Sequence, residues 1–137
     1  MVGMMNNKKN AAPSYILNGT VVHGHAIGRK IGMPTANLGN VTGEMPPIGV
    51  YMSSLRIEGI DRECYGITNV GTRPTVDDDA SICIETNIFD FDEDIYDRRV
   101  ELCIYEWLRP IQKFADFSKL MEQIEKDRAK TRAYFGC

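Results

Sequence analysis

The feature that most constrains this chain is a succession of short apolar runs, each closed by glycine, proline or asparagine. Runs of this length are too short for buried helices and are typical of β-strands. The clearest of them cover residues 15–23, 49–57, 64–70, 82–89 and 100–108. Five or six short strands joined by turns of this kind predict a small closed β-sheet.

One of these runs, residues 82–89, alternates between its two faces. Ile84 and Ile88 fall on one face, whereas Glu85 and Asn87 fall on the other. A strand with this pattern buries its apolar face and turns its polar face away from the core. Glu85 is therefore either an ordinary exposed carboxylate or a base that faces a substrate hydroxyl.

The end of the chain changes from strand spacing to helical spacing. One apolar stripe runs through Phe117, Leu120, Met121 and Ile124. This spacing predicts a helix from about residue 116 to residue 134. Asp116 suits the N-cap of that helix, and Gly136 suits its C-terminal stop.

Length and composition limit what the fold can contain. The chain has 137 residues, of which 43% are hydrophobic and 26% are charged, and these values are typical of one globular domain. Residues 1–13 are polar and rich in methionine, so we expect a mobile head or a remnant of cloning there. The folded domain should cover residues 14–137.

Charge and hydropathy exclude several classes of partner. The net charge is −3, which lacks the cationic excess that non-specific binding to nucleic acid requires. No apolar stretch reaches the roughly 18 to 20 residues of a membrane span, and the first ten residues do not resemble a signal peptide. We therefore expect a cytoplasmic protein that binds neither nucleic acid nor a membrane.

The residues that most often bind metals have unsuitable spacing. His23 and His25 lie two residues apart instead of four, and the acidic stretch 90–97 lacks the register of a calcium loop. The cysteines are far apart, without a C-x-x-C pair, and are expected to be reduced structural thiols. They are Cys64, Cys83, Cys103 and Cys137.

A glycine-rich segment follows the first strand and ends at residues 34–37. Gly24 and Gly28 can turn backbone N–H groups toward an anion, and Arg29 and Lys30 follow directly. The spacing matches neither a Walker A loop nor a dinucleotide motif, so a phosphate cradle and a plain hairpin connection both stay open.

The end of that segment also has two interpretations. Residues 34–37 can form a simple turn. Alternatively, the Thr35 hydroxyl and the Asn37 amide oxygen, two residues apart, can point the same way and share one hard cation.

Six segments, in this order, carry a more specific signal: GTVVHGHAIGRKIGMPTANL at 19–38, GVY at 49–51, GITNVGTRPTV at 66–76, ETNIFDFDEDIY at 85–96, LRPIQKF at 108–114 and QIEKD at 123–127. Together they resemble the riboflavin kinases, in particular the kinase module of bacterial bifunctional riboflavin kinase/FAD synthetases. The resemblance covers residues 14–134, and the combination of segments is much more specific than any one of them.

The resemblance implies a mainly β fold, a six-stranded antiparallel Greek-key barrel followed by one helix. It implies transfer of the γ-phosphoryl group of ATP to the ribityl 5′-hydroxyl of riboflavin, giving FMN and ADP. A non-catalytic flavin- or nucleotide-binding module is the alternative. We expect no adenylyltransferase activity from this chain. It can be a single-domain kinase or part of a longer protein with an N-terminal adenylyltransferase domain.

The resemblance also implies roles for individual residues. Glu85 occupies the position of the catalytic base. Thr35 and Asn37 occupy the magnesium positions, and because both ligands are neutral we expect Mg²⁺ to arrive bound to ATP. Arg109 lies in the segment that closes on the flavin. The positions that imply nucleotide contacts are Gly24, Gly28, Arg29, Lys30, Asn69 and Asn87.

Two positions depart from the family pattern. Asn87 replaces the usual histidine, and Asp97 replaces the usual glycine. Aspartate tolerates a left-handed backbone better than most residues, so we expect the turn to survive. Near the flavin segment, we expect Tyr105, Trp107 and Phe114 to pack in the core.

Overall fold

Six strands and one helix form the part of the chain that the computed structural model describes, which is residues 12–22, 35–74 and 80–137. Most of the head expected at residues 1–13 lies outside these ranges. The elements are β1 (Tyr15–Val22), β2 (Thr35–Thr42), β3 (Gly49–Ile57), β4 (Cys64–Pro74), β5 (Ala80–Ile88), β6 (Arg99–Arg109) and α3 (Phe117–Phe135).

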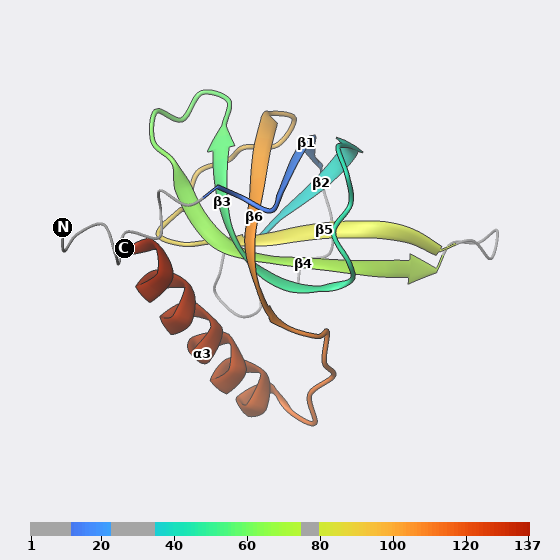
Figure 1. The fold of residues 1–137 in the computed structure, drawn as a ribbon, viewed down its shortest axis with the longest axis vertical. Helices are drawn as coiled ribbons and strands as arrows, with labels where there is room; N and C mark the ends of the chain where they lie inside the picture. Colours follow the sequence, from blue (N-terminus) through green and yellow to red (C-terminus); the bar gives the residue numbers. More distant parts are fainter. Residues whose placement is uncertain (1–11, 23–34, 75–79) are drawn as a thin grey trace.

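The strands close into a barrel in the order β1-β2-β5-β4-β3-β6, with every neighbouring pair antiparallel. Consecutive strands β3, β4 and β5 pair as hairpins, and β2 lies beside β5, which is the Greek-key arrangement. The barrel closes because β1 pairs with both β2 and β6. The predicted barrel with one C-terminal helix is confirmed (Figure 1).

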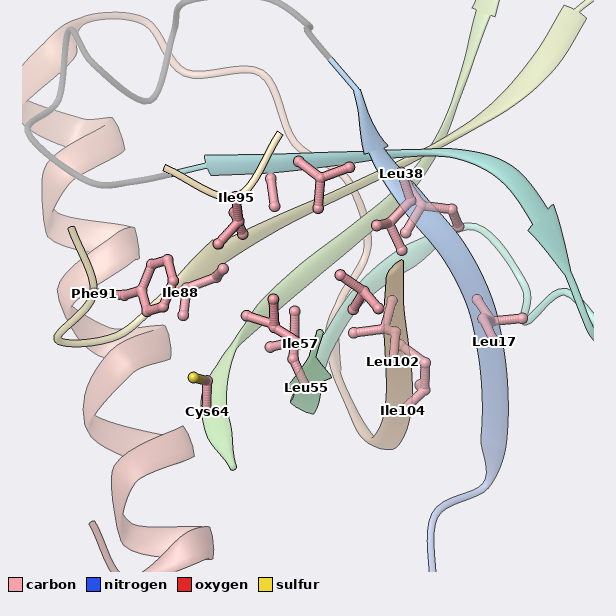
Figure 2. Close-up of a cluster of buried hydrophobic side chains, with 14 of the residues drawn as sticks. Leu17, Leu38, Leu55, Ile57, Cys64, Ile88, Phe91, Ile95, Leu102 and Ile104 are labelled. Atoms are coloured by element: carbon pink, nitrogen blue, oxygen red, sulfur yellow. The ribbon is translucent and has the colours of Figure 1, made fainter. Parts of the chain in front are cut away.

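The barrel interior is filled by the apolar faces of the strands. Residues such as Leu17, Leu55 and Leu102 are completely buried and point toward one another (Figure 2). Phe91 and Ile95, from the segment between β5 and β6, join the same cluster. The acidic side chains between them are exposed, as expected for a charged surface turn.

Helix α3 packs on the outside of the barrel, below β4 in Figure 1. Met52, Tyr105 and Phe135 form the buried contact, so β3 is covered on both faces and nearly every residue in it is buried. The predicted caps are confirmed: Asp116 accepts a hydrogen bond from the Lys119 backbone N–H at 3.0 Å, and Gly136 is left-handed with φ of 75°. In the described ranges, no helix combines the length and apolarity needed to cross a bilayer.

Two local expectations are decided by the structure. Asp97 is left-handed, with φ of 70°, and its backbone N–H donates to the carbonyl of Val21 at 2.8 Å, so aspartate does support the turn where glycine is usual. The simple turn considered for residues 34–37 is wrong from Thr35 onward, because β2 begins there. This strand has a weak sequence signal, since its apolar alternation is limited to Ala36 and Leu38 before Gly39 and Asn40 interrupt the pattern.

Candidate active site

Five residues predicted to carry chemistry lie on one outward face of three neighbouring strands. Asn37 on β2, Glu85 on β5 and Asn69 on β4 are paired across the sheet. Thr35 and Asn87 form the next row of the same face, two residues along each strand. Directly opposed side chains in such rows have Cβ atoms about 4.5–5.5 Å apart. The barrel therefore gathers Thr35, Asn37, Asn69, Glu85 and Asn87 into a single polar wall.

Within this wall, Thr35 and Asn87 are joined by a side-chain hydrogen bond. The Thr35 hydroxyl donates to the Asn87 amide oxygen at 3.0 Å. Because the proton of the hydroxyl points toward Asn87, its oxygen lone pairs are turned elsewhere. Thr35 and Asn37 thus place two neutral side-chain oxygens near the Glu85 carboxylate, and oxygens of this type could hold a hard cation.

A cleft of about 660 Å³ separates the polar wall from helix α3 and from the segment that precedes it. Its polar side contains Asn69, Glu85 and Asn87. Its opposite side is mainly apolar, with Ile111 and Phe117 left 46% and 56% exposed although they are large and hydrophobic. The full lining is Ile67, Asn69, Glu85, Asn87, Arg109, Ile111, Gln112, Phe114, Asp116, Phe117, Leu120, Ile124 and Asp127.

The apolar stripe predicted on the helix therefore has two environments. Phe117, Leu120 and Ile124 all line the cleft, but Ile124 is buried whereas Phe117 is largely exposed. Exposed apolar side chains gathered in a concave site are typical of ligand-binding surfaces. The stripe has the spacing expected of a core-facing helix, so spacing by itself did not reveal this role.

Arg109 lies in the cleft wall at the end of β6. Its guanidinium forms an ion pair with Asp127 on α3, at 2.8 Å between Nη2 and Oδ2. β6 reaches this position after irregular pairing with β3, since its register shifts twice between Ile104 and Arg109. Such shifts re-aim side chains near the end of a strand.

Aromatic residues near the cleft divide between core and site. Tyr105 is buried beneath α3, which confirms the expected core role. The expectation of core packing is wrong for Trp107, which is 49% exposed and lies edge-to-face against Tyr51 with 5.5 Å between ring centroids. Phe114 lines the cleft, so the expectation of core packing is wrong for it. Its position depends on the course of the segment after β6, which has no periodicity to analyse.

The predicted phosphate contacts Gly24, Gly28, Arg29 and Lys30 lie outside the described residues. A second hollow, of about 560 Å³, lies over β1, β2, β3 and β6 and contains none of the predicted site residues. It is lined by side chains of both charges, including Arg56, Glu58, Arg99 and Glu101. The polar wall and the cleft beside it are therefore the candidate active site.

Comparison with known proteins identifies the family of this chain. The family model for riboflavin kinase (flavokinase) matches residues 11–135. A bifunctional riboflavin kinase/FMN adenylyltransferase from Listeria monocytogenes is 39% identical over 123 residues, which cover 89% of this chain and 38% of that protein. The chain thus spans well under half the length of this relative.

Solved structures show the same fold. A protein from Streptococcus pneumoniae described as a macrolide-efflux protein has a TM-score of 0.76 and 35% identity, over 88% of this chain and 39% of that one. Riboflavin kinase from Trypanosoma brucei has a TM-score of 0.58 and 20% identity, over 86% of this chain and 77% of that one. With the family model matched over nearly all of its length, the chain belongs to the riboflavin kinase family.

Proposed function

We propose that this chain transfers the γ-phosphoryl group of ATP to the ribityl 5′-hydroxyl of riboflavin, giving FMN and ADP. The observation that carries the proposal is the position of Glu85. Its strand places it between Asn37 and Asn69 on the polar wall, across the cleft from an apolar wall, in a chain of the riboflavin kinase family. Riboflavin has a flat apolar ring and a polar tail, which match the apolar and the polar wall of the cleft.

The flavin would lie with its ring along Ile111, Phe114 and Phe117 and its ribityl tail directed at Glu85. The volume of the cleft is within the roughly 300–1,000 Å³ range of small-molecule sites. The large exposed apolar side chains of the cleft would lose their contact with water when the ring binds. This burial supports the apolar wall as the source of most flavin affinity.

Glu85 would act as the general base. In the reaction, the ribityl oxygen forms a bond to the γ-phosphorus, the bond from that phosphorus to the bridging oxygen of ADP breaks, and the hydroxyl proton passes to the Glu85 carboxylate. ADP leaves with the bonding electrons. Because phosphoryl transfer depends mainly on positioning and charge neutralisation, the chief task of Glu85 is to orient and deprotonate one hydroxyl.

The nucleotide would bind beside Thr35 and Asn37. These two residues would hold Mg²⁺ that arrives with ATP, and the ion would neutralise charge on the phosphates. Asn69 and Asn87 supply amide groups near the same place, and Asn87 also orients the Thr35 hydroxyl. Gly24, Gly28, Arg29 and Lys30 stay proposed phosphate contacts. We also infer that the chain acts in the cytoplasm, where ATP is available. The four free cysteines are consistent with that compartment, because thiols stay reduced there.

The direct test is to incubate the purified chain with riboflavin, ATP and MgCl₂, and to separate the flavins by chromatography. FMN that is absent when EDTA is added, without FAD, is the expected result. A chain that binds riboflavin but forms no FMN would instead be the non-catalytic binding module. A chain that binds neither riboflavin nor ATP would overturn both interpretations.

A further inference from the structure

A buried carboxylate on the helix is bonded to the segment that forms the apolar wall. The Asp127 residue is only 3% exposed, and its side chain faces the end of the cleft. Arg109 donates to it from Nε, at 2.9 Å to Oδ2, and from Nη2, at 2.8 Å to the same oxygen. The Gln123 amide donates to Oδ1 at 3.0 Å. A carboxylate this deeply buried requires such partners.

The rest of the Arg109 guanidinium is bonded to the following residues of the chain. Nη1 donates to the backbone oxygen of Pro110 at 3.3 Å and to the Gln112 side-chain oxygen at 3.4 Å. The guanidinium carbon also lies 5.8 Å from the centre of the Phe114 ring. Asp127 thus holds the Nε and Nη2 groups of Arg109, while the same guanidinium contacts three residues of segment 110–114.

Docking of the helix itself depends on different residues. Phe135 packs with Met52 and Tyr105 of the barrel, and Arg132 forms a separate ion pair with Asp90 at 3.1 Å. The side-chain bonds of Asp127 lead to Arg109 and, within the helix, to Gln123. Removal of the carboxylate should therefore disturb segment 110–114 more than the attachment of α3.

We propose that Asp127 is a positioning residue for flavin binding. Through Arg109 it holds segment 110–114 in place, so that Ile111 and Phe114 form the apolar wall before the ligand arrives. This inference rests on the proposed function, since it takes the ring of riboflavin as the group that meets the wall. A binding surface that is formed in advance loses less conformational entropy when its ligand binds.

The proposal is tested with Asp127→Asn and Arg109→Lys, separately and combined. Asn keeps the shape of the side chain but removes the charge, and Lys keeps the charge but loses the two-pronged guanidinium geometry. Asp90→Asn is the matched control, because it breaks the other ion pair between α3 and the barrel, away from the cleft. Riboflavin affinity is measured by quenching of flavin fluorescence, and KM and kcat are measured for both substrates.

We expect Asp127→Asn to weaken riboflavin binding roughly 10- to 100-fold, as misplacement of a positioning segment does elsewhere, with the KM for ATP within about twofold of the original. Arg109→Lys should have a similar effect, and the double variant should lose little more, because both changes break one ion pair. Asp90→Asn should leave riboflavin affinity unchanged.

Unchanged riboflavin affinity in a folded Asp127→Asn chain, or fully additive effects in the double variant, would overturn the proposal. If Asp127→Asn does not fold, Gln123→Ala decides, since it removes one bond to Asp127 and does not line the cleft. It should raise the KM for riboflavin about two- to fivefold, and an unchanged KM would contradict the proposal.

A parent chain that binds riboflavin without forming FMN would refute only the kinase activity, whereas a parent chain that does not bind riboflavin would refute both the kinase activity and the role of Asp127.

Discussion

At the scale of single residues, chemistry depends on a few side chains whose neighbours lie on other strands. Glu85 belongs to the polar face of β5, as Asn87 does. It is distinguished by its place in the sheet, between Asn37 on β2 and Asn69 on β4. Thr35 is a strand residue whose hydroxyl is directed by Asn87, the residue that replaces the usual histidine. The departure from the family pattern is therefore compatible with an ordered site.

The first prediction concerns Glu85. Replacement by Gln keeps the shape of the side chain but removes its ability to accept a proton, so kcat should fall about 10²- to 10⁴-fold while riboflavin binding changes little. Steady-state kinetics and a flavin titration measure the two quantities. Wild-type turnover in Glu85→Gln would remove Glu85 from the mechanism.

A second residue-scale prediction concerns Thr35. Thr35→Ala removes one proposed oxygen ligand and the donor to Asn87, so activity should fall and added Mg²⁺ should restore only part of it. Activity measured across a range of MgCl₂ concentrations tests this. Thr35→Ser, which keeps the hydroxyl, is the control and should retain the original dependence; identical magnesium curves for Ala and the parent would argue against ligation.

At the scale of elements, the site depends on how closely β4 and β5 approach each other. Gly66 on β4 faces β5 so closely that an added Cβ would overlap the backbone oxygen of Asn87. On the same strand, an added Cβ at Gly71 would meet no atom within 4 Å. The close approach of β5, which positions Asn87 in the polar wall, therefore requires the glycine at position 66 but not the glycine at position 71.

This difference predicts opposite outcomes for two similar variants. Gly66→Ala should reduce the free energy of unfolding by about 1–3 kcal/mol, because strand β5 must move away. Gly71→Ala should be neutral or stabilising by up to about 1 kcal/mol, because alanine restricts the unfolded chain. Urea unfolding of both variants measures the difference, and equal stabilities would contradict the close approach.

The attachment of α3 to the end of β5 predicts a dependence on pH. Two hydrogen bonds from Arg132 hold the pKa of the Asp90 carboxyl below its usual value. The backbone of Asp90 is left-handed, with φ of 53°. Because the folded pKa is lowered, the stabilisation is present above the unfolded pKa, which is near 3.9, and is lost as pH falls through the folded value.

Asp90→Asn should therefore reduce stability at about pH 6 by less than about 1 kcal/mol, as expected for an exposed pair, and have a smaller effect near pH 3. Asparagine tolerates the left-handed backbone, so the change isolates the charge. Urea unfolding at both pH values is the measurement. Arg132→Gln should reproduce the effect, and equal losses at both pH values would show that the ion pair is not its source.

At the scale of the whole molecule, closure of the barrel determines both the core and the site. The interior side chains pack against one another, while the outward faces of β4 and β5 contribute Asn69, Glu85 and Asn87 to one wall of the cleft. Helix α3 and the segment before it form the other wall. The cleft lies between these two walls and needs both of them, so the candidate site exists only in the complete fold.

Closure also predicts the reactivity of the thiols. Cys64 belongs to the barrel core, and burial raises its pKa, whereas Cys137 is exposed at the C-terminus. An aromatic disulfide reagent should label Cys137 rapidly and Cys64 only when the barrel unfolds, because the thiolate is the reactive form. Labelling followed by mass spectrometry measures this order, and Cys137→Ser should abolish the fast phase. Equal rates in the native protein would contradict the closed barrel.

The sequence alone determined the properties that repeat along the chain. Short apolar runs closed by turn residues predicted the strands other than β2, a helical period predicted α3, and Asp116 and Gly136 predicted its ends, because each depends on neighbours within a few residues. The combination of segments also identified the family. The tertiary structure decided what depends on residues far apart in sequence: strand β2, the row of Asn37, Glu85 and Asn69, and the ion pair from Asp127 to Arg109. Such contacts follow from strand order and helix docking, which local periodicity does not encode.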